Sequence, residues 1–459
     1  MNRQQELENT SIGRLLLKYS IPAIIGMLVN ALYNVVDRGF IGNIPDVGNA
    51  AMAGVVITMP IVTIILGFSM LIGIGTTAYI SIKLGEHQRE EAEKALGNGF
   101  VIATFMALIL MVLGLIFAPH LLKLFGGNEE TIPYGAQYIN IFLVGTLFNV
   151  LGFCFTSIMR ADGSPKMSSV CMVIGCVLNI ILDYVFVFVI QMGIEGAALA
   201  TIISQAVTAI IGLWHFTKGK SGLKLRKHYF KCDLSVIKNI VAIGMAPATM
   251  QMAISLVQVV MNNVLNRTGG QVAVAAMGVI SAVTMLVLMP IFGINQGAQP
   301  IIGYNYGAKN YRRAKETSIL SMIAATIILT IGCIIIEIMP GFFVRIFDGT
   351  GEIAPVAVPG IRIYVLTLPI LAVSIMGSNY FQAIGKAKVA TVLSLLRQVL
   401  VLIPVIYIAS SIGGLTGAWC AQPISDVICT VIVGFVLIKE FRSYKENSHE
   451  VLLKSQTSE

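Results

Sequence analysis

Apolar runs long enough to cross a lipid bilayer recur along almost the whole chain. Of its 459 residues, 56% are hydrophobic and only 12% are charged, whereas a soluble domain averages roughly 25% charged residues. A helix needs about 20 apolar residues to cross the bilayer core, and in lipid only helices and closed barrels satisfy their backbone polar groups. The runs therefore predict an all-α integral membrane protein.

Twelve such runs can be distinguished, and they cover approximately residues 13–37, 50–82, 95–118, 134–159, 167–190, 196–217, 236–265, 273–305, 316–339, 357–384, 389–410 and 415–438. The only long gap is rich in Lys and Arg and divides the runs into two sets of six. We therefore expect an N-terminal lobe over 1–217, a basic linker over 218–235, a C-terminal lobe over 236–440 and a tail over 441–459.

The two sets of six resemble each other at a nearly constant offset. Ser20-Ile-Pro22 corresponds to Met245-Ala-Pro247 at 225 residues, and Gly196-Ala197 corresponds to Gly417-Ala418 at 221 residues. Because six is even, both halves enter the membrane from the same side, which defines a parallel repeat. We expect two six-helix bundles arranged as a V, with a cleft between them that alternates between the two sides of the membrane.

The distribution of Lys and Arg predicts the orientation. With both termini in the cytoplasm, the leader (residues 1–12), the tail and the loops after even-numbered spans carry most of these residues, as the positive-inside rule requires. Anionic membrane lipid is then a sufficient partner for the basic segments, so the net charge of +8 does not indicate nucleic-acid binding. We expect a multi-pass protein of the cell (cytoplasmic) membrane. The first run follows an acidic leader and is of full length, so it should remain as the first span.

Two carboxylates lie deep within apolar runs of the first half. Asn179 and Asp183 are four residues apart, so they lie one turn apart on one helix face. The second acid is Asp37. Polar residues share its helix face at helical spacing: Asn30, Tyr33 and Asn34. A carboxylate without water must hold a proton or bind a cation, so these residues predict a cation- or proton-handling site. The alternative is that both acids are satisfied polar groups that help the helices to pack.

Uncharged polar residues and methionines mark other faces that we expect to line the cleft. Gln205 belongs to a polar face of the sixth span that also includes Thr201. A stripe at helical spacing follows the seventh span: Gln251, Ser255, Gln258 and Asn262. We expect this stripe to line a hydrated substrate path. The alternative is that these residues form hydrogen bonds between helices. Met285 is a candidate for a pliable drug-binding surface, although packing is the commoner role of methionine.

Arg397 and Asp426 are the remaining charges expected deep within spans. Pairing is the natural way to keep two such charges in lipid, so we predict that they pair or share a polar network. A structural role and a role in ion coupling both remain open for this network.

Sequence signatures of enzymes and metalloproteins are missing. The seven cysteines show no spacing typical of disulfide frameworks or metal sites. No P-loop, His-Glu-x-x-His or Gly-x-Ser-x-Gly motif occurs. We expect no enzymatic activity, no cofactor, no metal beyond a coupling Na⁺, and no ATP-driven pumping by this chain alone.

Several motifs occur in the order typical of one transporter family: Tyr33-Asn-Val-Val-Asp37, Met159-Arg-Ala-Asp-Gly-Ser-Pro-Lys166, Leu178-Asn-Ile-Ile-Leu-Asp183, Leu396-Arg-Gln-Val-Leu and Gln422-Pro-Ile-Ser-Asp426. Over about residues 10–442, the chain resembles multidrug and toxic compound extrusion (MATE) transporters, in the branch with MepA-like and DinF-like members. The resemblance implies a V-shaped pair of six-helix lobes that exports organic cations in exchange for H⁺ or Na⁺.

The resemblance also assigns roles to individual residues. It implies a cation site in the N-terminal lobe and a helix that can bend at a proline. The residues matching the cation site are Asp37, Tyr33, Asn179, Asp183 and Thr201, and the proline is Pro22. Asn262 stands where the repeat would place a counterpart of Asp37, and Val401 and Val405 stand where it would place those of Asn179 and Asp183. The second lobe therefore lacks the acids that bind Na⁺ in some branches, which slightly favours H⁺.

The expected function is secondary active efflux of cationic amphiphilic small molecules by a monomer, the usual state in the family. When the carboxylates take up H⁺ or Na⁺ from outside, the lobe loses its affinity for the drug, and release of the ion inside restores it. The alternative is a lipid-linked precursor flippase of the same superfamily. Such flippases line their cleft with Arg and Lys, whereas deep within the spans here, away from their ends, there is one Arg and no Lys.

Overall fold

The computed structural model describes residues 3–44, 47–347, 351 and 353–456. Within these ranges every regular element is a helix, which confirms the all-α fold class. In chain order they are α1 (Arg3–Asn9), α2 (Ile12–Gly42), α3 (Gly48–Gly85), α4 (Arg89–Leu124), α5 (Ile132–Val144), α6 (Thr146–Ala161), α7 (Pro165–Asp183), the π-helix η1 (Tyr184–Val189), α8 (Gly193–Thr217), the 3₁₀-helix η2 (Lys227–Phe230), α9 (Leu234–Gly307), α10 (Tyr311–Ile338), α11 (Pro340–Phe347), α12 (Ala354–Val365), α13 (Leu368–Ala383), α14 (Ala387–Leu395), the π-helix η3 (Leu396–Val401) and α15 (Leu402–Gln456).

The helices account for the twelve expected spans. Eight helical stretches in the described part are long and apolar enough to cross a membrane, and two bent pairs raise the number to ten. Two of the stretches each hold two spans. A straight helix of 74 residues such as α9 would be about 110 Å long, but α9 breaks at Gly270, where φ is 67°. α15 breaks in the same way at Gly414, where φ is 55°.

The internal repeat is visible in the bends of two helix pairs. α5 and α6 meet at 55° in the first half, and α12 and α13 meet at 54° in the second. The loops after α3 and α9 also match, because His87 and Lys309 both adopt φ of 59°, in the left-handed region. These two residues are 222 apart, as the sequence repeat predicts.

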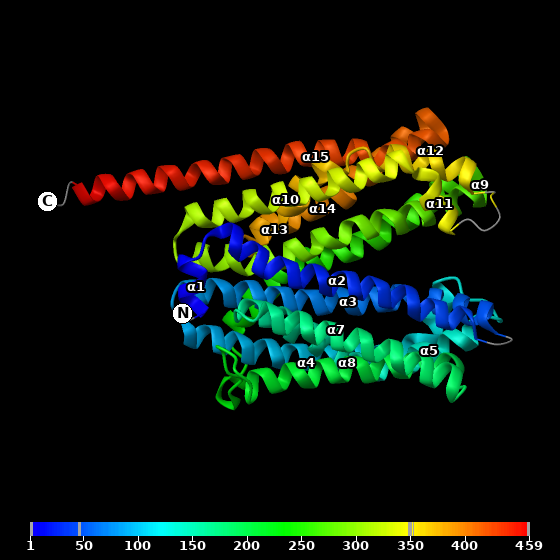
Figure 1. Ribbon diagram of the computed structural model, residues 1–459, viewed down its shortest axis with the longest axis horizontal. Helices are drawn as coiled ribbons and strands as arrows, with labels where there is room; N and C mark the ends of the chain where they lie inside the picture. The colour runs from blue at the N-terminus through cyan, green and yellow to red at the C-terminus, as the bar shows by residue number, and fades with distance from the viewer. Residues whose placement is uncertain (1–2, 45–46, 348–350, 352, 457–459) are drawn as a thin grey trace.

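The helices of the two halves form two groups that lie side by side (Figure 1), and each half builds its own hydrophobic core. The largest cluster in the second half contains residues between Met261 and Ala421, including the almost fully buried Trp419. Nearly all members of the corresponding cluster in the first half lie between Ile41 and Ala198, and Ala248 of α9 joins them. The first arm of α9 therefore packs against the first half although it begins the second.

Close backbone contacts through glycine join the halves at the end of the molecule that carries the N-terminus. A Cβ atom on Gly85 of α3 would overlap the carbonyl oxygen of Tyr304 in α9, and one on Gly307 of α9 would overlap that of Ile82 in α3. The two glycines are 222 residues apart, so the contact is reciprocal across the repeat. The backbones of α3 and α9 are so close here that a side chain at either position would force the helices apart. We call this contact of α3 with α9 at Gly85 and Gly307 the seam between the halves, and it is closed at this end.

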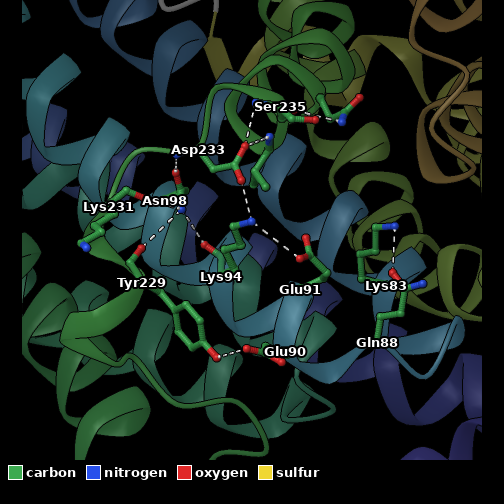
Figure 2. Close-up of polar contacts among 12 residues, drawn as sticks. Lys83, Gln88, Glu90, Glu91, Lys94, Asn98, Tyr229, Lys231, Asp233 and Ser235 are labelled. Carbon is green, nitrogen blue, oxygen red and sulfur yellow. Dashed lines mark hydrogen bonds and ion pairs between the residues drawn. The ribbon is translucent and has the colours of Figure 1, made fainter.

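The linker between α8 and α9 is bound to the first half (Figure 2). The amide of Asn98 in α4 donates to the carbonyls of Tyr229 and Lys231, both at 3.3 Å, and accepts from the backbone N–H of Asp233 at 2.8 Å. Lys94 forms an ion pair with Asp233 at 2.5 Å. Asp233 also caps α9, since its carboxylate accepts from the first N–H groups of that helix. Hydrogen bonding to Lys94, together with this capping, lowers the pKa of the Asp233 carboxyl.

A second anchor lies at the other end of the linker. The buried carboxylate of Asp162 accepts from the N–H groups of Gly222 at 3.1 Å and Leu223 at 2.7 Å. The linker therefore follows the first half rather than hanging as a flexible tether.

Asn98→Ala is expected to release the linker. The substitution removes three side-chain contacts with linker backbone, and since a hydrogen bond contributes about 0.5–1.5 kcal/mol, local opening should become roughly tenfold more frequent. Trypsin should then cleave within 218–231 roughly tenfold faster. Asn239→Ala is the control, because that amide bonds only the Ser235 carbonyl of its own helix. Equal cleavage rates for the two variants would contradict this account.

Candidate functional site

A cavity of about 170 Å³ lies within the first half, among α2, α6, α7 and α8. Its wall is lined by Asn30, Tyr33, Phe148, Asn149, Gly152, Phe153, Thr156, Met172, Gly175, Cys176, Asn179, Thr201, Ser204, Gln205 and Thr208. The wall thus combines aromatic rings with amide and hydroxyl groups. Water takes up about 30 Å³ per molecule in the liquid, so the cavity can accommodate several waters or part of a larger ligand.

The two predicted acids meet beside this cavity. Asp37 of α2 is 8% exposed and Asp183, the last residue of α7, is fully buried. The two carboxyl groups lie next to each other. Because two ionised carboxylates have no hydrogen to share, a hydrogen bond between them needs one proton on the pair. One oxygen of each acid, Oδ1, has no hydrogen-bond partner among the described residues.

Asn179 and Thr201 hold Asp183 in place. The Asn179 amide donates to Asp183 Oδ2 at 3.0 Å and accepts from the backbone N–H of Thr201 at 3.2 Å. The i, i+4 spacing of Asn179 and Asp183 in α7 produces the first contact, and the packing of α8 on α7 produces the second. Directly after Asp183 the helix widens into the π-helix η1, a local distortion that is frequent at functional sites.

The structure thus brings together Asp37, Tyr33, Asn179, Asp183 and Thr201, the five residues expected to form an ion site. A carboxyl pair with two free oxygens, an amide and a hydroxyl can hold one proton or a small hard cation such as Na⁺. The role of these residues in ion coupling stays a prediction.

Tyr138 of α5 belongs to the same cluster and was missed by sequence reasoning. Its side chain is 5% exposed and lies near Thr201, Asp37 and Asp183. A tyrosine in an apolar run is a weak signal by itself, because buried tyrosines commonly pack in cores. Its nearness to the acids depends on how α5 packs against α8, which spacing along the chain does not reveal.

The residues predicted to line a cleft are distributed between two environments. Asn30 and Gln205 line the cavity, whereas Asn34 is exposed and donates to the Asn30 carbonyl of its own helix at 2.7 Å. The other predicted cleft residues do not line this cavity: Gln251, Ser255, Gln258, Asn262 and Met285 are exposed or half-buried on α9. Their contribution to a substrate path stays a prediction.

Pro22 lies inside α2, which runs through it as one helix. The residues around it pack directly on the second half: Cβ atoms on Gly297 and Gly293 of α9 would meet the backbone of Ser20 and Ile24, respectively. Bending at Pro22 stays a prediction.

Asp426 is 2% exposed in α15 and accepts hydrogen bonds from Gln422 at 3.0 Å and Thr367 at 3.4 Å. Arg397 lies in η3, and its carbonyl accepts from Ser425 at 3.4 Å. The Arg397 and Asp426 side chains form no direct ion pair in this structure. The two residues are connected indirectly, because Ser425, which precedes Asp426 in α15, donates to the Arg397 carbonyl.

Comparisons with known proteins agree on one family. The MatE family model matches residues 22–185 and 247–408. The multidrug export protein MepA of Staphylococcus haemolyticus is 25% identical over 430 residues, covering 94% of each chain, and that of Staphylococcus aureus strain MRSA252 is 25% identical, covering 92% of this chain and 93% of its own. A solved outward-facing structure of a multidrug resistance MATE family transporter superposes with a TM-score of 0.91 at 23% identity, covering 97% of this chain and 99% of its own.

Tyr138→Phe is expected to weaken ion binding at the acid pair without unfolding the protein. It removes a buried hydroxyl next to Thr201 and the acid pair, and a net contribution of about 1 kcal/mol from one polar contact corresponds to roughly fivefold in affinity. The measurement is the Na⁺ concentration, or the pH, at half-maximal shift of the melting temperature in detergent. Tyr134→Phe, one turn earlier in α5, is the control, and an identical midpoint for both variants would show that the Tyr138 hydroxyl has no role.

Proposed function

The chain belongs to the MatE family, and on that premise we propose that it is a secondary active antiporter, which exports organic cations in exchange for H⁺ or Na⁺ by alternating access. The observation that carries this proposal is the adjacent, buried pair Asp37 and Asp183 beside a polar and aromatic cavity. The MepA relatives are named multidrug export proteins, which supports small-molecule export from the cell.

The acid pair supplies the coupling in this proposal. With one or two negative charges the pair attracts a cationic ligand into the lobe, and each bound H⁺ or Na⁺ weakens this attraction by removing one negative charge. Ligand and ion therefore weaken each other's binding, and this reciprocity is the thermodynamic requirement for exchange. Asn179, Thr201 and Tyr138 hold the carboxyl pair and the bound ion in place.

The cavity supports a ligand with a cationic end. Phe148, Phe153 and Tyr33 line it together with amide groups, and aromatic faces attract cations. Pockets for drug-sized ligands usually measure roughly 300–1,000 Å³, so the cavity of about 170 Å³ would receive only part of such a molecule. The remainder would extend toward the second half, where Gln251 approaches Gly67 of α3.

The closed glycine seam represents one end state of the proposed cycle. With both termini in the cytoplasm, the closed end faces inward, and ions would reach the acids from the outside. Opening the other state requires separation of α3 from α9 at Gly85 and Gly307. The protein would work as a monomer in the cell membrane, with lipid around its exposed apolar faces.

The flippase alternative receives less support. A lipid-linked pyrophosphate needs a positively charged site, whereas the cavity is lined by neutral groups and adjoins two acids. The family and its multidrug export relatives are transporters and not enzymes, so we propose no catalytic reaction.

Asp37→Asn and Asp183→Asn are each expected to abolish gradient-driven export, because an amide takes up no proton near neutral pH and lacks the negative charge that attracts Na⁺. The measurement is efflux of a fluorescent organic cation from proteoliposomes under either a pH gradient or a Na⁺ gradient. The gradient that drives the wild-type protein identifies the ion.

Asp426→Asn serves as the matched control, since it neutralises a buried acid outside the cavity and should retain most of the transport. Transport that survives both N-lobe substitutions would refute the coupling role. Absence of cation transport by the wild-type protein under both gradients would refute the proposed function.

A further inference from the structure

The short helix α1 lies across the closed seam, at the end of the molecule that carries the N-terminus (Figure 1). Glu8 Oε1 accepts a hydrogen bond from the Tyr304 hydroxyl of α9 at 2.8 Å and lies 3.8 Å from Nε2 of His87, in the loop after α3. One carboxylate thus contacts both halves.

Two backbone carbonyls near the end of α1 make further contacts with the second half. The Arg313 guanidinium, at the start of α10, donates to the carbonyls of Leu7 at 3.1 Å and Thr10 at 2.7 Å. Asn305 of α9 orients this guanidinium by accepting from its Nε at 3.1 Å. Arg313 therefore caps the carboxyl end of α1, where a cation is favoured by the helix dipole.

Burial of Leu7 adds an apolar contact at the same point. Leu7 is 4% exposed and packs in a cluster to which both halves contribute, including Leu84 of α3 and Tyr304 of α9. Separation of the halves would expose Leu7, and the free energy gained by burying this apolar side chain would be lost.

Covalent connection places α1 with the first half. Only Thr10 and Ser11 separate it from α2, and Glu6 pairs with Lys18 of α2. The linker likewise binds the first half through Asn98 and Asp162, so its contacts need not break when the halves move. The contacts of Leu7, Glu8 and Thr10 with the second half, by contrast, cross the seam.

We propose that α1 is a latch that stabilises the state closed at the N-terminal end. This inference rests on the proposed function, in which the halves rock against each other. Before α3 and α9 can separate at Gly85 and Gly307, Tyr304 must leave Glu8 and Arg313 must leave the two carbonyls. The leader thus sets how often the inward-facing state is visited.

The test measures access to the seam with a cysteine reporter. Ser81 of α3 is 1% exposed and faces Gly303 of α9, so Ser81→Cys should react slowly while the seam is closed. The reporter is placed in a chain whose exposed Cys232 is replaced by Ser. A membrane-impermeant maleimide is applied to inverted vesicles, and labelling is compared with the same chain lacking the reporter.

Glu8→Ala and Tyr304→Phe are each expected to raise the labelling rate of the reporter about tenfold. Glu6→Ala, which removes a carboxylate of the same helix whose partner among the described side chains is Lys18 of the first half, should leave the rate within about twofold. Rates that are equal in Glu8→Ala and Glu6→Ala, or unchanged in Tyr304→Phe, would overturn the latch.

The assay needs no transported substrate, so its outcome is separate from that of the export experiment. If cation transport fails but labelling is faster in Glu8→Ala, the latch proposal stands and the proposed export of organic cations is refuted. Normal transport with unchanged labelling would reject the latch alone. Tyr304→Phe guards against misfolding of the leader variant, because it removes a single hydroxyl on the other side of the contact.

Discussion

In lipid, backbone N–H and C=O groups cannot be left without hydrogen-bond partners, and this constraint determines where the chain can depart from regular helix. The breaks at Gly270 and Gly414 lie between spans, where positive φ lets a helix reverse without a clash. Departures within the membrane are milder and keep most backbone groups paired: two bends of about 55° and two π-helices. One π-helix begins directly after Asp183, so the backbone of α7 is least regular where the ion site needs a shaped wall.

The helix α2 connects the acid pair with the seam between the halves. Asp37 lies near one end of this helix, and Ser20 and Ile24 near the other pack on glycines of α9. A change at the acids can therefore reach the seam through one element, and Pro22, within the part of α2 that packs on α9, is the place where bending costs least. Because α1 precedes α2 directly, the same helix also carries the leader that crosses the seam. In the proposed cycle, ion binding and gate closure would act on one continuous segment of the first half.

Sequence reasoning found what local spacing encodes and missed what depends on packing. The twelve spans follow from apolar runs, and the Asn179–Asp183 contact follows from spacing of one helical turn. The meeting of Asp37 with Asp183 needed the family resemblance, since nothing local relates α2 to α7. Tyr138 escaped notice because its place near the acids depends on how α5 packs against α8. The role of the leader was equally hidden: its acidic composition gave no sign that Glu6 pairs with Lys18 of α2 while Glu8 contacts Tyr304 of α9.

The two halves share a frame but differ in the charges that they carry. The bends, the left-handed residues His87 and Lys309, and the reciprocal glycines repeat almost unchanged. The ionisable groups do not repeat, since Asn262, Val401 and Val405 replace the acid-site residues in the second half. The repeat axis runs along the membrane normal, so each glycine contact and its counterpart lie at the same end of the molecule and close that end together. In the proposed function, an ion that binds the acid pair shifts the equilibrium between states through the first half, and the ion gradient sets the direction of exchange. A symmetric frame with an acid pair in one half is therefore sufficient, in this proposal, to couple an ion gradient to the movement of a second cation.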